Sequence, residues 1–271
     1  MMYSNAHPTI RSVWNQLFFP FFGGDAWSWG LTVGLLPVIT WINSAATVQF
    51  NSTYYQTITS LADCFVVQQE QSAFLLFTIP LFLLTTQLGR RHDFSSLFIL
   101  KRHSKRRIFA AQSLKIVLYA FLFSLYDTIC TALTGSFLVP STINWHRADS
   151  LYYLTTESVN TSASLWGIAI SFFLTVFIRL SCMGLLFLLV WWLSKKSILS
   201  WILAMSVLCW DIFFPRLAII PGRASISYLC WKHHTIVGGS AVVIGIGILL
   251  FIIGYWLSVR KEFLGEKHTD G

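Results

Sequence analysis

Charge is scarce in this chain of 271 residues, because only 11% of them are Asp, Glu, Lys or Arg. A soluble globular domain carries roughly 25%. Hydrophobic residues make up 55% of the chain, and they occur in runs long enough to cross a hydrocarbon core of about 30 Å at about 1.5 Å per residue. This composition excludes a soluble domain and predicts an all-α integral membrane protein.

Motifs that identify a nucleotide, metal or hydrolytic site are also missing. The sequence has no GxxxxGK[ST] loop, no HExxH zinc motif and no GxSxG nucleophile motif. Its five cysteines form no CxxC pair, although Cys64 and Cys230 both fall on predicted outer segments, where a disulfide between them is an open alternative. We therefore expect no catalytic residue, no metal and no cofactor in the chain itself; any ATP would be bound by a partner subunit.

Acidic residues are fewer than basic ones, 11 against 19, which gives a net charge of +8. Such an excess is typical of nucleic-acid binding when it covers a soluble domain. Here the basic residues gather beside the apolar runs, most densely over residues 90–115, where Asp93 is the single acid. Short basic loops next to membrane spans stay in the cytoplasm. The charge therefore predicts orientation in a membrane and no binding of nucleic acid.

Apolar segments predict six transmembrane helices with both termini in the cytoplasm. Residues 1–26 are expected to form an N-terminal interfacial helix, because apolar and polar residues alternate there at helical spacing. The six-helix domain is expected over residues 27–258 and a cytoplasmic tail over 259–271. The predicted spans are residues 27–49, 73–89, 114–138, 165–193, 198–213 and 235–257. Residues 214–234 are too short to span and predict a re-entrant or surface-lying outer hairpin.

The basic loop between the second and third spans has two open interpretations. Its charges alternate with apolar residues, which predicts a short amphipathic helix along the membrane surface. In one interpretation the charges only orient the protein; in the other the loop docks a soluble partner. The candidate docking residues are Phe94, Leu97, Phe98, Lys101, Arg102, Lys105, Arg106 and Arg107.

Three charged residues, Asp127, Arg179 and Asp211, fall within predicted spans. Charges are costly in hydrocarbon and normally face the protein interior. Counted from the cytoplasmic ends of their spans at about 1.5 Å per residue, Asp127 and Arg179 lie about 18 Å and 24 Å deep. These depths favour a buried ion pair between the third and fourth spans, and a substrate or proton path is the alternative.

Several segments together resemble the ABC transporter type-2 permease family. Residues 24–27 resemble the frequent Asp-Pro start of that family, with Ala26 in place of proline, and residues 101–107 resemble its cytoplasmic coupling segment. Residues 259–263 resemble its basic exit from the last span, and the likeness in length and span order covers nearly the whole chain. The resemblance implies a permease subunit of an ATP-driven exporter of peptides, antimicrobials or lipid-like molecules. It also implies a homodimer or heterodimer of permeases and a cytoplasmic ABC ATPase that binds the ATP.

A polytopic membrane protein outside the ABC class, such as an immunity or accessory protein or an integral-membrane enzyme, is the second hypothesis. An enzyme needs convergent polar groups, yet the three charges within the spans are accompanied by no nucleophile or metal set. We therefore expect a multi-pass protein of the bacterial cell membrane, in contact with the lipid bilayer, that is not itself an enzyme.

Overall fold

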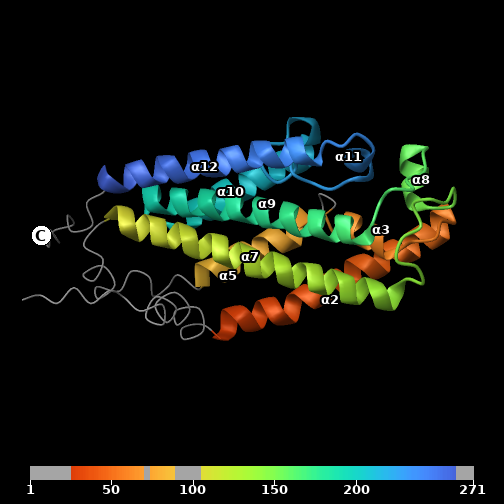
Figure 1. Ribbon diagram of the computed structural model, residues 1–271. Helices are drawn as coiled ribbons and strands as arrows, with labels where there is room; N and C mark the ends of the chain where they lie inside the picture. The colour runs from red at the N-terminus through yellow and green to blue at the C-terminus, as the bar shows by residue number, and fades with distance from the viewer. Residues whose placement is uncertain (1–25, 70–73, 89–104, 261–271) are drawn as a thin grey trace, which may run out of the picture.

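The computed structural model describes residues 26–69, 74–88 and 105–260. All named secondary-structure elements in these ranges are helical, and the long helices lie side by side in a bundle (Figure 1). The predicted interfacial helix and most of the coupling segment lie outside the described residues, as does the tail beyond Arg260.

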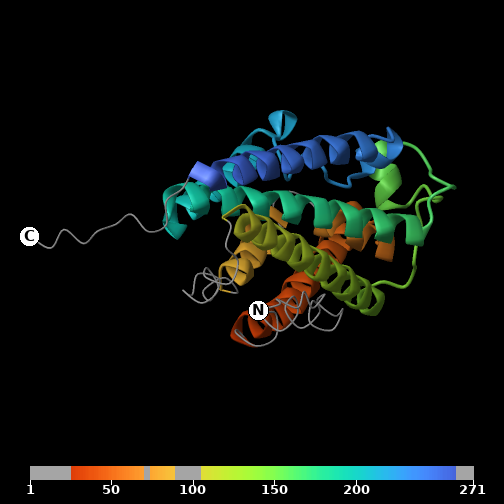
Figure 2. The ribbon, with the colours of Figure 1, turned by 60° about the vertical axis from the view of Figure 1, so that its left-hand side comes forward.

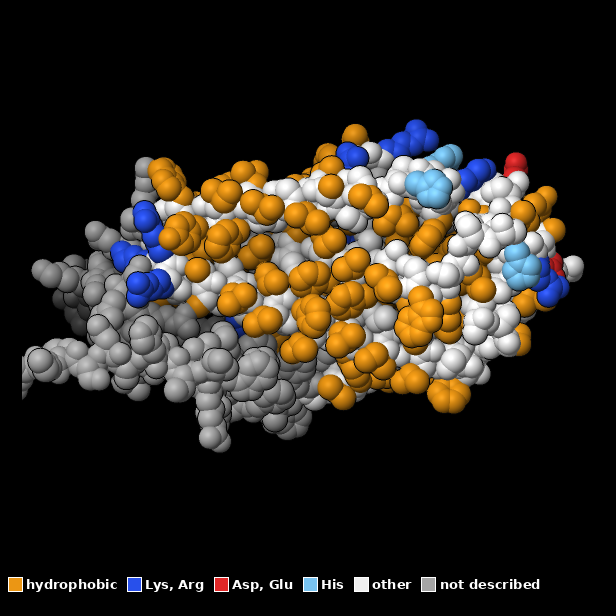
Figure 3. Space-filling model, viewed as in Figure 1, with side chains coloured by type: hydrophobic (Ala, Val, Ile, Leu, Met, Phe, Trp, Pro, Cys, Tyr) orange, Lys and Arg blue, Asp and Glu red, His pale blue; other side chains and the backbone are white. Residues whose placement is uncertain are grey.

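Four helices are long and apolar enough to cross a membrane. They are α2 (Ala26–Phe50), which continues into the π-helical turn η1 (Asn51–Tyr55), α7 (Lys105–Leu138), α9 (Leu165–Ser194) and α12 (Ile236–Arg260). On the face shown in Figure 3, hydrophobic side chains cover the long middle of the bundle, whereas Lys and Arg gather toward its ends. The fold is thus all-helical, with at least four candidate spans, as expected of a multi-pass membrane protein.

Two further apolar helices are shorter. The π-helical turn η2 (Phe74–Thr78) runs into α5 (Ile79–Leu88), and α10 (Ser197–Phe213) has 17 residues. At about 1.5 Å per residue, 17 residues reach about 26 Å, which is short of the hydrocarbon thickness. In Figures 1 and 2, the six apolar helical segments alternate in direction along the bundle. Six crossings remain our prediction for this alternating arrangement.

Labelling on either side of α10 tests the six-span prediction. If α10 crosses the membrane, Lys196 before it and Arg216 after it lie on opposite sides. We expect a cysteine at position 216 to react with an impermeant maleimide in intact cells, and one at 196 to react only after permeabilisation. In the protein that receives these labelling cysteines, only Cys209 and Cys230 need to be replaced by serine, because the other three native cysteines are buried. Equal labelling of both positions in intact cells would contradict the prediction.

Helix α9 occupies the centre of the bundle. It packs against α7, α10 and α12, and also against α5 and α3 (Leu61–Gln68). In Figure 2, α12 and α2 lie on opposite sides of the α7–α9 pair. Several of the most enclosed side chains of the core, including Phe172, Val176 and Met183, belong to α9.

Short helices cover the end of the bundle opposite the start of α7. They are α3, α8 (Leu151–Thr156), the 3₁₀ turn η3 (Pro215–Leu217) and α11 (Tyr228–Lys232) (Figure 1). The segment between the first two predicted spans contains α3, seven of whose eight residues are buried. We call the assembly of α3 with residues 139–164 and 214–235 the cap.

Candidate functional site

Asp211 organises one part of the cap. It lies near the end of α10, is fully buried and accepts three backbone N–H bonds, from Ile219 (2.7 Å), Ile220 (3.3 Å) and Gly222 (2.8 Å). When several N–H groups donate to one carboxylate, they compensate its negative charge. The carboxylate in turn fixes the backbone turn that supplies these donors. Asp211 therefore folds residues 214–222 back over the bundle.

Arg179 lies beneath this turn, in the middle of α9. Its guanidinium group stacks 3.8 Å from the ring centroid of Phe74, and Nη1 donates to Oε1 of Gln69 at 3.3 Å. Asp211 is close enough to act on it electrostatically. The Nε and Nη2 groups of Arg179 have no hydrogen-bond partner among the described residues. The stacking and the single hydrogen bond therefore only partly compensate for burying this charge.

Gln69 connects Arg179 to the cap. Its Nε2 donates to the Phe172 carbonyl (3.0 Å) and to the Thr175 hydroxyl (2.6 Å), and its Oε1 also accepts from the backbone N–H of Ile226 (3.1 Å). One uncharged side chain thus joins α3, α9 and the hairpin at residues 214–234. Sequence reasoning missed Gln69 because a lone glutamine carries no motif.

The predicted ion pair between Asp127 and Arg179 is not formed. Both carboxylate oxygens of Asp127 lack a hydrogen-bond partner among the described residues. Asp127 shares a face of α7 with Phe123, which packs on Phe82 of α5, whereas Arg179 interacts with Gln69, Phe74 and Asp211. The two residues therefore face different neighbours, and counting their depths along the helices could not show this difference.

Asp63 ties the cap together. Oδ2 accepts from the backbone N–H and hydroxyl of Ser60, both at 2.8 Å, and forms the capping box of α3. Oδ1 accepts from the Trp145 indole (2.8 Å) and the Tyr228 hydroxyl (3.0 Å). Burial raises the pKa of the Asp63 carboxyl, while these hydrogen bonds lower it. The Ser-x-x-Asp spacing was the available sequence signal, but it indicates only the helix start.

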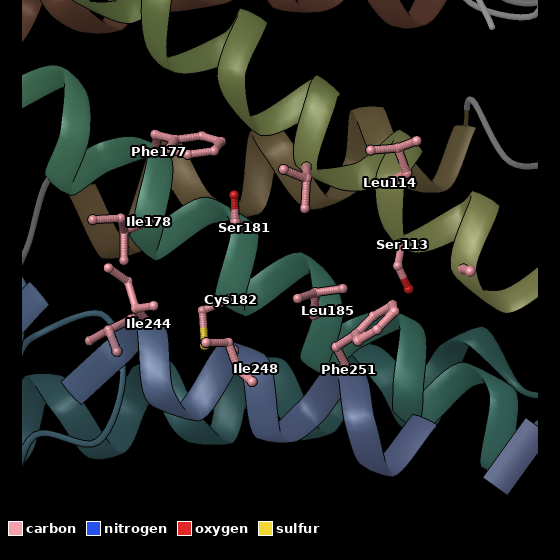
Figure 4. A pocket seen from close by; sticks show the side chains of 14 residues that line it. Ser113, Leu114, Phe177, Ile178, Ser181, Cys182, Leu185, Ile244, Ile248 and Phe251 are labelled. Atoms are coloured by element: carbon pink, nitrogen blue, oxygen red, sulfur yellow. The ribbon is translucent and has the colours of Figure 1, made fainter. Parts of the chain in front are cut away.

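An apolar groove of about 410 Å³ opens between α7, α9 and α12. Figure 4 shows Leu114 of α7, Phe177 and Leu185 of α9, and Ile248 and Phe251 of α12 around it. The few polar groups in its lining are serine hydroxyls and the thiol of Cys182. A groove of this composition suits an apolar molecule or chain segment.

The opposite end of the bundle is basic. Lys105, Arg106 and Arg107 form the first turn of α7, and Lys195 and Lys196 form the turn between α9 and α10. No acidic residue of the described ranges accompanies them at this end. Of the candidate docking residues, only Lys105, Arg106 and Arg107 are described; Phe94, Leu97, Phe98, Lys101 and Arg102 lie outside the described residues.

Two packing contacts hold the basic turn of α7 against its neighbours. The guanidinium of Arg106 lies 5.5 Å from the ring centroid of Tyr255 on α12. The Phe109 ring meets Trp192 of α9 edge-on at 5.5 Å and presses on Gly254, where an added Cβ would lie 2.1 Å from the ring. The basic turn is therefore attached to α9 and α12, two of the helices that line the groove.

Neither a metal site nor a disulfide is found in the part of the chain that the structure describes. Its residues contain no group of three or more His, Cys, Asp or Glu that could hold a metal ion. Cys64 and Cys230 are free thiols, so the alternative of a disulfide between them is not realised.

No family model matches the sequence, and neither a curated protein nor a solved structure shows significant similarity to it. The function is therefore argued from the residues and their geometry.

Proposed function

We propose that the protein is the membrane-embedded permease subunit of an ATP-driven exporter in the cell membrane, and that a separate cytoplasmic ATPase supplies the energy. The observation that carries the proposal is the connection between the basic turn of α7 and the helices around the apolar groove. A second permease subunit would complete the assembly.

The basic turn is not explained by the stability of α7. Lys105, Arg106 and Arg107 occupy the N-terminal turn, where the helix dipole already places partial positive charge. Cations there are unfavourable by roughly 0.3–1 kcal/mol each, so their presence favours a role outside the helix. The side chains of Arg106 and Arg107 are exposed, as an acidic docking partner requires.

Movement at this turn would reach the groove through packed side chains. Phe109 is buried between α7, α9 and α12, and its contacts with Trp192 and Gly254 leave little room for independent movement. A partner that tilts the start of α7 would therefore change the spacing of the three helices that line the groove. The apolar lining favours a lipid-like molecule or an apolar peptide as the exported substrate.

Charge reversal at the basic turn tests the proposal. We expect Arg106→Glu/Arg107→Glu to insert normally, because other basic residues still orient the protein. It should fail to co-purify with the ATPase encoded nearest to its gene and should lose substrate-stimulated ATP hydrolysis, since an interface charge needs a complementary patch.

Lys195→Glu/Lys196→Glu is the matched control, because it reverses two exposed charges at the same end of the bundle. This control should still capture the ATPase. Size-exclusion chromatography should show that the wild type, the Arg106/Arg107 variant and the Lys195/Lys196 variant are all folded. Wild-type protein that captures no ATPase, or an Arg106/Arg107 variant that captures it undiminished, would overturn the proposal.

A further inference from the structure

The apolar groove between α7, α9 and α12 contains two hydroxyl groups that the described fold leaves unpaired (Figure 4). Ser113 of α7 and Ser181 of α9 both line the groove, and neither hydroxyl has a hydrogen-bond partner among the described residues. Ser113 is only 3% exposed. Because buried polar groups are normally paired, these hydroxyls indicate an occupant that brings oxygen acceptors into the groove.

Other hydroxyl groups of the same two helices are paired within their own helix. On α7, Ser124 donates to the Phe121 carbonyl at 2.9 Å. On α9, Thr175 donates to the Ser171 carbonyl at 2.7 Å. A bond of this kind satisfies a hydroxyl in apolar surroundings without any ligand. The two serines of the groove do not make it, so their donors remain available to an occupant.

The basic turn of α7 lies at one end of this groove. Arg106 and Arg107 precede the lining residue Ala110 by four and three residues, so all three share one face of the helix. The guanidinium of Arg106 lies 5.5 Å from the ring centroid of Tyr255, which in turn stacks at 6.0 Å on Phe251 in the groove lining. Two positive charges therefore border the groove where it approaches the end of the bundle.

The chemistry of this face of α7 changes in a fixed order along the helix. Arg106 comes first, and Ser113 follows about 10 Å further along at about 1.5 Å per residue. The apolar Val117 lies one turn beyond Ser113, opposite the apolar side chains of α9 and α12. A phospholipid presents its groups in the same order, with the phosphate first, then the ester carbonyls and then the acyl chains.

We propose that the groove binds one phospholipid of the surrounding bilayer, and that its headgroup carries net negative charge. The phosphate pairs with Arg106 and Arg107, an ester carbonyl accepts from Ser113, and an acyl chain lies between the three helices. Guanidinium groups are well suited to phosphate oxygens, and basic sites between transmembrane helices suit anionic lipid headgroups. A zwitterionic headgroup fits less well, because its own cation would lie beside two arginines.

This inference deepens the proposed function, because it names the class of molecule held in the groove. As a substrate for export, the lipid rests on the proposed function; as a ligand of the groove, it does not. Binding is measured on the purified protein without the ATPase. A protein that binds no lipid could still capture the ATPase, and one that captures no ATPase could still bind lipid, so the two failures are distinguishable.

Lipid titration of the purified full-length protein tests the site. In detergent, we compare dioleoyl phosphatidylglycerol with dioleoyl phosphatidylcholine, which has the same acyl chains and a zwitterionic headgroup. Native mass spectrometry should show phosphatidylglycerol saturating near one molecule per chain and binding at least tenfold more tightly than phosphatidylcholine. Arg106→Gln/Arg107→Gln should bind the two lipids equally, because it removes the charge that selects between the headgroups.

Gly247→Leu fills the groove and should weaken the binding of both lipids at least tenfold. Gly247 lines the groove, and a Cβ added there lies 3.9 Å from Sγ of Cys182, which is ordinary contact. Gly245→Leu is the matched control. It adds the same side chain to α12 at a position outside the groove lining, where an added Cβ meets nothing within 4 Å. This control should bind both lipids as the wild type does.

Ser113→Ala is a smaller change that tests the hydroxyl even if Gly247→Leu does not fold. Loss of one hydrogen bond should weaken the binding of both lipids about fivefold. Ser124→Ala should leave binding unchanged, because the Ser124 hydroxyl bonds to its own helix. Wild type that binds the two lipids equally, or Gly247→Leu or Ser113→Ala with undiminished affinity, would overturn the proposal. Wild type that binds neither lipid would also overturn it and would leave the groove to an apolar protein segment.

Discussion

The Asp63→Ala variant is expected to unfold roughly 10 °C below the wild type. The substitution removes the acceptor of the Trp145 indole N–H (2.8 Å) and of the Tyr228 hydroxyl (3.0 Å). Trp145 is 0% exposed, so water does not replace the lost acceptor. An unpaired buried donor costs about 1–3 kcal/mol, and the lost capping box at Ser60 adds about 1 kcal/mol.

Asp149→Ala is the matched control for this prediction. Asp149 also pairs with its neighbour, at 2.7 Å from Arg147, but the two side chains are 42% and 53% exposed. An exposed pair contributes about 0–1 kcal/mol, so the unfolding temperature should hardly change. Thermal unfolding of both variants in detergent measures the difference. Equal shifts would show that Asp63 does not hold the cap together.

The helices of the bundle could be predicted from sequence because each one satisfies its own backbone hydrogen bonds. In a membrane, length and hydropathy therefore suffice to locate a helix. The segment predicted over residues 165–193 is α9, Leu165–Ser194, and the one over 198–213 is α10, Ser197–Phe213. Helix α7 begins at Lys105, nine residues before the span predicted over residues 114–138, because its basic first turns are helical without being apolar.

Partners of the buried polar residues could not be predicted, because they depend on the rotation of each helix. Counting gave similar depths for Asp127 and Arg179, but their side chains face different neighbours. Asp63 lies 82 residues from Trp145 and 165 from Tyr228, so no local pattern connects the three. The basic residues Lys105, Arg106 and Arg107 could be identified, since charge beside an apolar run is visible in the sequence. Their role as a docking surface remains a prediction.

Gly239→Ala is expected to displace the cap hairpin from α12. A Cβ at Gly239 would lie 2.2 Å from the backbone carbonyl oxygen of Arg223. Main chain cannot rotate away as a side-chain tip does, and the hydrogen bonds to Asp211 and Gln69 fix the backbone on both sides of Arg223. The methyl group therefore separates α12 from the hairpin instead of being absorbed by it.

Trypsin measures this separation, because it cleaves after Arg216 and Arg223 once the hairpin opens. We expect cleavage in detergent to be at least tenfold faster in Gly239→Ala than in the wild type. Gly245→Ala makes the same change six residues further along α12, where an added Cβ meets nothing within 4 Å. Alanine favours a helix over glycine by about 1 kcal/mol, so this variant should be cleaved no faster than the wild type. Because intrinsic helix preference acts equally at both positions, only the contact with Arg223 can separate them. Indistinguishable cleavage of the two variants would therefore show that the hairpin does not rest on Gly239.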